Sequence, residues 1–287
     1  MNAYAIPTCL TLLLCMPALP GFAQGDGGGA LDGRLESSVT RSNEAPRDTE
    51  ARVTFSTGAE LSTGDYGDDE DTDILYVPLS LKYDTPHFIG RITVPYISID
   101  GPGDVVGGTQ GPVLTGSGNA GVGTSREGGI GDVIGSLTFV VNPEAESFPI
   151  VELTGKVKLP TADEDDGLGT GETDYTAQID LSQTFGRVTP FVTFGNRWLG
   201  DSSDLDLNDT LFGSVGFSVQ AASRLQLGAS YDYREASSSR SDDAREIVLF
   251  GSYRFSKTWK VSPYVVFGTS DASPDLAVGF SVSYRIR

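Results

Sequence analysis

The last stretch of the chain, residues 276–287, alternates strictly between apolar side chains and small or charged ones. Successive side chains of a β-strand point to opposite faces, so this pattern predicts a strand with one apolar and one polar face. The apolar positions are Leu276, Val278, Phe280, Val282, Tyr284 and Ile286. Strands of soluble proteins are usually about 5–6 residues long, whereas a bilayer-crossing strand needs about 9–11. This strand is long enough to span a membrane, although a long soluble strand would show the same local pattern.

The same alternation recurs throughout the chain before this strand. It is found near residues 52–61, 75–83, 88–96, 132–141, 151–159, 174–181, 190–198, 211–220, 225–234, 246–255 and 259–267. Repeated alternating segments of membrane-spanning length, separated by turn residues, are typical of outer-membrane barrels. We therefore predict an all-β fold, a transmembrane antiparallel up-and-down β-barrel of about 12 strands that occupies residues 51–287.

The overall composition looks like that of a soluble protein. Only 38% of the residues are hydrophobic and the mean hydropathy is −0.13. Alternation explains this, because every apolar residue of a barrel strand is diluted by a polar one. After residue 23 no apolar run approaches the roughly 18–20 residues of a membrane helix, so the sequence excludes a helical membrane protein.

The N-terminus differs from the rest of the chain. Residues 1–23 contain an apolar core followed by small residues at a cleavage site before Gln24, which predicts a secretory signal peptide. Residues 24–50 are Gly-rich, polar and aperiodic, and we interpret them as a flexible leader. Both cysteines, Cys9 and Cys15, lie inside the signal, so we expect no disulfide in the mature protein.

The connections between the predicted strands alternate between short and long. Outer-membrane barrels have short periplasmic turns and longer external loops, so an even strand count places both termini in the periplasm. Aromatic residues gather near the strand ends, as interfacial girdles require. We expect localisation in the outer membrane of a Gram-negative cell. The expected partners are outer-membrane lipid, lipopolysaccharide, the barrel-assembly machinery and a small-molecule solute.

Several motifs carry a family resemblance across residues 59–284. They are Gly128–Asp132, Leu159–Thr161, Gly167–Gly171, Asp174–Tyr175, Tyr231–Arg234, Arg245–Glu246 and Ser270–Asp275. Together they resemble a family of outer-membrane barrels labelled as transporters or as proteins of the meta-pathway of phenol degradation. The resemblance implies passage of small compounds, aromatic ones among them, across the outer membrane.

Charge and residue usage argue against several other functions. A formal net charge of −19 rules against nucleic-acid binding. Enzymatic barrels of the lipase type use a Ser-His pair near the outer rim, but the only histidine, His87, is predicted beside a periplasmic turn. We expect neither an enzyme nor a cofactor.

Acidic residues are dense in two predicted outer loops. The weak candidates for divalent-cation ligands are Asp68, Asp69, Asp71, Asp163 and Asp165. Their spacing departs from an EF-hand loop, so solvated loops are the preferred interpretation and no metal site is predicted.

The polar face of the strands is the predicted functional site. Its charged members, which we expect to line a pore, are Arg91, Asp132, Glu152, Lys156, Lys158, Asp180, Arg197, Asp232, Arg234, Glu246 and Arg254. Small inward residues such as Gly228 and Gly279 are expected to leave open volume. The favoured hypothesis is a passive channel for small solutes, aromatic or hydrophobic ones included. The alternative is a plugged barrel that serves as a structural anchor or adhesin-like scaffold without transport.

Overall fold

The computed structural model describes residues 51–66, 71–101, 105–106, 113–114, 125–141, 148–200, 207–239 and 241–286. The predicted signal peptide (residues 1–23) and leader (residues 24–50) lie outside these residues. Among the described residues, there is no helix that is long and apolar enough to cross a membrane.

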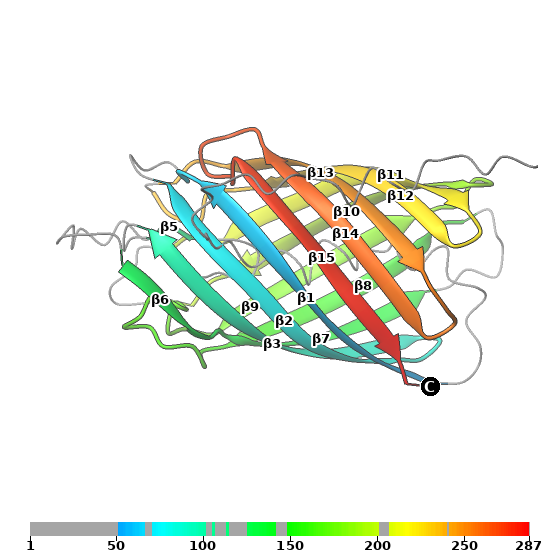
Figure 1. The fold of residues 1–287 in the computed structure, drawn as a ribbon, viewed down its shortest axis with the longest axis horizontal. Helices are drawn as coiled ribbons and strands as arrows, with labels where there is room; N and C mark the ends of the chain where they lie inside the picture. Colours follow the sequence, from blue (N-terminus) through cyan, green and yellow to red (C-terminus); the bar gives the residue numbers. More distant parts are fainter. Residues whose placement is uncertain are drawn as a thin grey trace, which may run out of the picture.

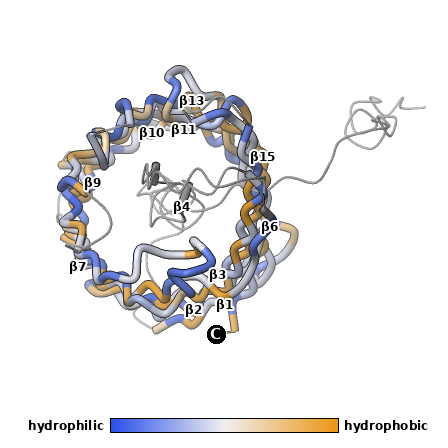
Figure 2. Tube along the Cα trace, turned by 90° about the vertical axis from the view of Figure 1, so that its left-hand side faces the viewer, coloured by the Kyte–Doolittle hydropathy of each residue, from blue (hydrophilic) through white to orange (hydrophobic). Residues whose placement is uncertain are grey.

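Within the described part of the chain, thirteen strands form one antiparallel sheet that closes on itself (Figures 1 and 2). They are β1 (Arg52–Gly64), β2 (Thr72–Asp84), β3 (Phe88–Gly101), β6 (Ser125–Ile130), β7 (Val133–Val141), β8 (Ile150–Leu159), β9 (Asp174–Ser182), β10 (Val188–Trp198), β11 (Thr210–Ala222), β12 (Leu225–Arg234), β13 (Ala244–Arg254), β14 (Trp259–Gly268) and β15 (Leu276–Arg285). The last strand, β15, pairs with β1 and completes the ring. Two short strands, β4 (Val105–Val106) and β5 (Val113–Leu114), pair only with each other.

Strands β6 and β7 occupy one position in the ring. Both pair with the same strand, β7 with the first half of β3 and β6 with the second half. Between them the register shifts by one residue, because Thr93 pairs with Ile134 whereas Tyr96 pairs with Ile130. A β-bulge of this kind bends a strand without ending it. The ring therefore has twelve strand positions, which confirms the predicted fold class.

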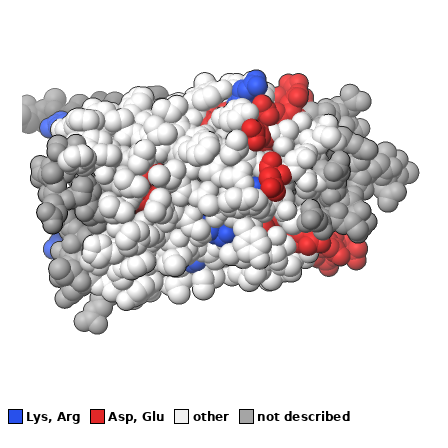
Figure 3. Space-filling view, turned by 180° about the vertical axis from the view of Figure 1, so that it is seen from behind, with Lys and Arg blue, Asp and Glu red and all other residues white. Residues whose placement is uncertain are grey.

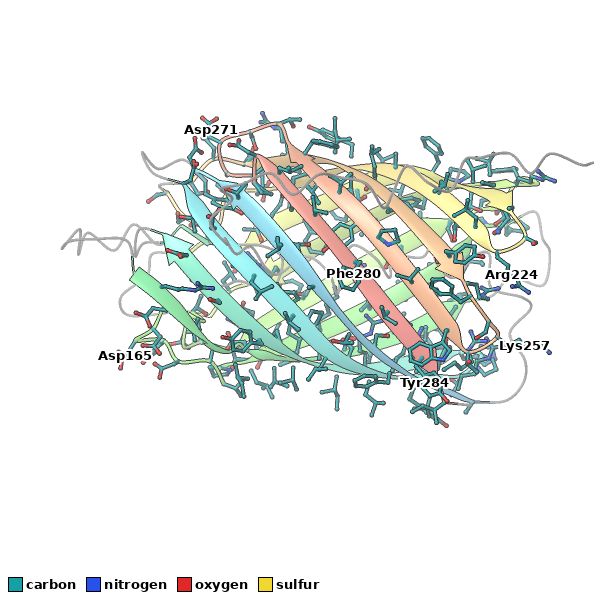
Figure 4. The ribbon with its side chains drawn as sticks, viewed as in Figure 1. Asp165, Arg224, Lys257, Asp271, Phe280 and Tyr284 are labelled. Carbon is teal, nitrogen blue, oxygen red and sulfur yellow. The ribbon has the colours of Figure 1, made fainter. Side chains whose placement is uncertain are left out.

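Apart from residues 142–149 between β7 and β8, which were expected to be short but outnumber the residues of two longer connections, the lengths of the connections alternate as expected. Short connections, at residues 85–87, 183–187, 223–224 and 255–258, lie at the end of the barrel that holds the C-terminus. Longer connections, at residues 65–71, 160–173, 199–209, 235–243 and 269–275, join strand ends at the other end. We call these the turn end and the loop end. In Figure 4, Arg224 and Lys257 mark the turn end, and Asp165 and Asp271 mark the loop end.

The outward face carries the apolar half of the alternation. Leu81, Leu137, Val215 and Phe280 are exposed, although each belongs to a regular strand. Aromatic pairs on this face lie near the turn end: Phe88 with Phe139, Tyr253 with Phe255, and Trp259 with Tyr284, with ring centroids 5.1, 4.9 and 4.7 Å apart. Figure 3 shows a surface that is largely uncharged in the middle, with acidic side chains gathered toward one end. An apolar band of this extent is unfavourable in water and is typical of a membrane-facing surface.

Candidate functional site in the barrel interior

The structure places every charged residue predicted for the polar face at an inward position. Arg91 lies on β3, three residues (Glu152, Lys156, Lys158) on β8, Asp180 on β9, Arg197 on β10, two (Asp232, Arg234) on β12, and two (Glu246, Arg254) on β13, while Asp132 follows the bulge between β6 and β7. Most of them are buried, and Lys156, Asp232, Arg234 and Arg254 are half-buried. Inward charge is thus a real property of this barrel, and its arrangement differs from one end to the other.

A buried ion network lies on the inner wall toward the loop end. Lys158, whose side chain is 2% exposed, bridges two carboxylates, with its Nζ 3.0 Å from Asp132 and 3.2 Å from Asp174. The same Nζ donates a hydrogen bond of 2.7 Å to Thr170 Oγ1. Two carboxylates and a hydroxyl surround the ammonium group, so the charge is compensated where water is excluded.

This network holds the connection between β8 and β9 inside the barrel. The backbone N–H groups of Thr161 and Ala162 donate to Asp132 Oδ1 at 2.9 and 3.0 Å. Gly167 and Gly171 have φ values of 68° and 69°, a conformation that favours glycine. The loop therefore turns back sharply at these two glycines.

The tip of this folded-in loop is apolar. Leu168 is 2% exposed and belongs to a buried cluster with residues of β2, β3, β13, β14 and β15. The strand members of this cluster are Ile74, Tyr76, Ile97, Ile99, Val248, Tyr264, Val266 and Ala277. Side chains pointing away from lipid here form an apolar core within the barrel, and the loop narrows the interior at that level.

Polar side chains elsewhere on the inner wall bond to one another. Thr193 Oγ1 donates to Asp180 Oδ1 at 2.6 Å, and Gln178 Nε2 donates to both oxygens of the same carboxylate. Ser214 Oγ donates to Asp232 Oδ1 at 2.6 Å. The Thr193–Asp180 and Ser214–Asp232 bonds run between neighbouring strands, the Gln178–Asp180 bonds run along β9, and all of them satisfy polar groups that face away from lipid.

Aromatic rings cover glycines on the inner wall. Each ring and its glycine are direct partners on neighbouring strands: Phe212 with Gly195, Phe191 with Gly216, Phe250 with Gly228, and Tyr264 with Gly279. A Cβ atom added to any of these glycines would collide with the partner ring. The rings of Phe191 and Phe250 approach to 6.4 Å between centroids.

This arrangement corrects one expectation from the sequence. Gly228 and Gly279 do not leave open volume, because a ring lies over each of them. The sequence pattern did not single out the inward aromatic residues, because their packing depends on which residue faces them on the next strand. A glycine opposite an aromatic residue is a usable signal only when the register of the strands is known.

Basic side chains surround a pocket at the turn end. Its charged lining residues are Arg52, Lys82, Asp84, Arg254, Lys257, Lys260 and Arg285. Asp84 is the one acid among them and lies 3.9 Å from Lys82 Nζ. Positive charge is therefore in excess around this pocket.

The acidic loops show no cation site within the described residues. No group of three or more histidine, cysteine, aspartate or glutamate residues in this part of the chain is arranged to hold a metal ion. Asp163 Oδ1 accepts a bond of 3.1 Å from the backbone N–H of Asp165, which is a local turn contact. Asp71 is exposed, and Asp68 and Asp69 lie outside the described residues.

The fold and its interior define a class: a transmembrane β-barrel of the outer-membrane type, with an apolar outer surface and a largely polar inner one. The chain belongs to the family described as "Putative MetA-pathway of phenol degradation", whose model matches residues 51–286. The family resemblance seen in the sequence is thereby confirmed.

Several solved structures are similar to this chain. The crystal structure of an outer membrane channel from Pseudomonas putida F1 matches with a TM-score of 0.63 at 12% identity, over 85% of this chain and 100% of that one. The KdgM porin matches with a TM-score of 0.49 at 10% identity, over 82% and 99% of the two chains. The CymD monoaromatic hydrocarbon channel matches with a TM-score of 0.45 at 12% identity, over 91% and 94%. The first of these likenesses shows a shared fold. A search of curated proteins found no significant match.

Proposed function

We propose that this protein is a passive channel of the outer membrane for small solutes, aromatic and hydrophobic ones included. The observation that carries the proposal is the set of four inward aromatic rings that lie over glycines of the neighbouring strand. A ring that covers a glycine extends along the wall and leaves the axis less obstructed. Phe250, the one ring of the four that is only partly buried, also offers a flat apolar surface on which an aromatic solute can leave water at low cost. Transport down a gradient needs no cofactor and no chemical step.

Orientation forms part of the proposal. We place the turn end and both termini in the periplasm and the loop end outside, as the loop lengths of outer-membrane barrels favour. In this orientation the apolar face contacts outer-membrane lipid, and the acidic loops lie near lipopolysaccharide. The barrel-assembly machinery would insert the chain.

Single cysteines test the orientation, because the predicted mature chain has none. Cysteines replacing Asp165 or Asp242, at the loop end, should react with an impermeant thiol reagent on intact cells. Cysteines replacing Ala222 or Thr258, at the turn end, should react only after the outer membrane is opened. Labelling of the second pair on intact cells would invert the proposed orientation.

Planar-bilayer recording tests the channel itself. The refolded protein should show discrete conductance steps, and benzyl alcohol, a neutral water-soluble aromatic compound, should reduce the current in a saturable manner. Phe250→Ala removes part of the inner aromatic surface and should weaken this block. Phe217→Ala is the matched control, because Phe217 lies on the outward face of β11 and is 49% exposed. Equal loss of block in both variants would contradict the role of the inner rings.

Two observations favour the second function, a plugged scaffold. Many inward side chains are buried, and the loop between β8 and β9 packs inside the ring. Membranes that stay silent across a range of voltages, with no solute entry into liposomes, would favour the scaffold over the channel.

A further inference from the structure

Two donor nitrogens of a buried arginine on the inner wall have no hydrogen-bond partner in the described part of the chain. Arg197 lies on β10, faces the interior and is 1% exposed. Within the described chain, no group accepts a hydrogen bond from its Nε or Nη1. A guanidinium is always charged, and burial without a partner is unfavourable, so such a group is expected to meet an anion or water in the working protein.

A second buried polar group without a partner stands directly opposite. Thr210 is the residue of β11 that pairs with Arg197 in the register of the sheet. Its side chain is fully buried, and its hydroxyl has no hydrogen-bond partner in the described part of the chain. Two unsatisfied polar groups thus belong to directly paired residues on neighbouring strands, and both are turned inward.

The nearby charges favour an anion at this place. Among the described residues, Asp174 and Arg234 are charged groups that act on Arg197. Asp174 is already engaged, since it lies 3.2 Å from Lys158 Nζ and accepts a bond of 3.2 Å from the backbone N–H of Gly200. Arg234 adds a second positive charge beside Arg197.

An aromatic surface adjoins the same two residues. Phe212 is the next inward residue after Thr210 along β11, and its ring covers Gly195, the inward residue before Arg197 along β10. A carboxylate matches the two N–H groups of a guanidinium in geometry and charge. A ring attached to that carboxylate would reach Phe212.

We propose that Arg197 and Thr210 form a carboxylate-binding subsite in the barrel interior, with Phe212 beside it, and that its ligands are small aromatic acids. The inference deepens the proposed channel function, because it names a class of solute. The inferred subsite rests on the proposed channel function only because solutes must reach the barrel interior to bind there.

The test is calorimetric titration of the detergent-solubilised full barrel with sodium benzoate, and it needs no conductance. The wild type should bind benzoate saturably, and benzyl alcohol should bind clearly more weakly. Loss of a charge-assisted pair of bonds predicts that Arg197→Gln weakens benzoate binding at least about tenfold. Arg197→Lys should bind with intermediate strength, and Thr210→Val should lose about threefold.

Arg224→Gln is the charge-matched control. Arg224 is exposed at the turn end between β11 and β12, so this variant should bind benzoate like the wild type. Heat-modifiable migration on gels verifies that each variant is folded. Unchanged benzoate binding in folded Arg197→Gln would overturn the subsite, as would equal binding of benzoate and benzyl alcohol. Absence of benzoate binding to the wild type would overturn it as well.

The two proposals can fail separately. Benzoate binding in a protein that never conducts would retain the subsite and refute the channel. Discrete conductance in a protein that does not bind benzoate would retain the channel and refute the subsite.

Discussion

The two ends of the barrel use inward charge differently. Toward the loop end, Lys158 is enclosed by Asp132, Asp174 and Thr170, and the whole group holds a folded-in loop. At the turn end, basic side chains predominate around a pocket and share one acid, Asp84. Opposite charges packed together cancel over a short range and act as structural links. Charges of one sign leave a net field and act on ions that pass.

The largest expected effect is on stability and concerns the ion network at the loop end. Lys158→Met leaves two carboxylates, Asp132 and Asp174, buried without their cation. Breaking a buried pair in this way should lower the free energy of unfolding by about 3–5 kcal/mol. Urea unfolding of the protein in lipid vesicles, followed by heat-modifiable gel migration, measures the change.

Lys156→Met is the control for that variant. Lys156 lies two residues earlier on the same face of β8, but it is only half-buried. Its replacement should cost no more than about 1 kcal/mol. Equal destabilisation by the two substitutions would contradict the structural role assigned to the ion network at the loop end.

A smaller effect is expected when the folded-in loop is loosened without touching a charge. Gly171 has a φ of 69°, and a Cβ there would collide with the Glu164 side chain. Gly171→Val should destabilise the inward conformation by about 1–3 kcal/mol and raise the single-channel conductance.

Gly155→Ala provides the comparison, because a Cβ at Gly155 meets open space. Conductance of this variant should match that of the wild type. A Gly171→Val channel with wild-type conductance would show that the loop does not narrow the path.

Charge reversal at the turn end should alter selectivity while stability changes little. Arg254→Glu and Lys260→Glu each replace a positive charge at the pocket by a negative one, so chloride permeability should fall relative to potassium by a few-fold, on the order of 2–5. Reversal potentials under a salt gradient measure this ratio. An unchanged ratio would show that ions do not pass this pocket.

The smallest effect is expected at the exposed acids of the loop end. Asp271 is exposed at this end (Figure 4). Asp271→Asn should lower cation preference by less than about 1.5-fold at 0.1 M salt, and the difference should vanish near 1 M salt as screening shortens to about 3 Å. A large effect that persists at high salt would place Asp271 closer to the ion path than the exposed loop suggests.

Alternation in the sequence does not distinguish inward charges that have different surroundings. Lys156 and Lys158 have the same chemistry and the same parity on one strand, and the pattern places both among the inward charges. The structure makes them different, because only Lys158 lies where Asp132, Asp174 and the folded-in loop converge. Proximity of this kind comes from elements that are separate in sequence, so no local pattern reveals it.

Alternation by itself determined the all-β barrel, its twelve strand positions, the apolar outer face and the inward position of each predicted charge. These properties follow from the period of a strand and from the length of a membrane crossing, and both are local. Only the tertiary structure decided which side chains face each other. The register of the sheet sets Phe250 over Gly228 and Thr210 opposite Arg197, and it depends on pairings between strands that alternation leaves free.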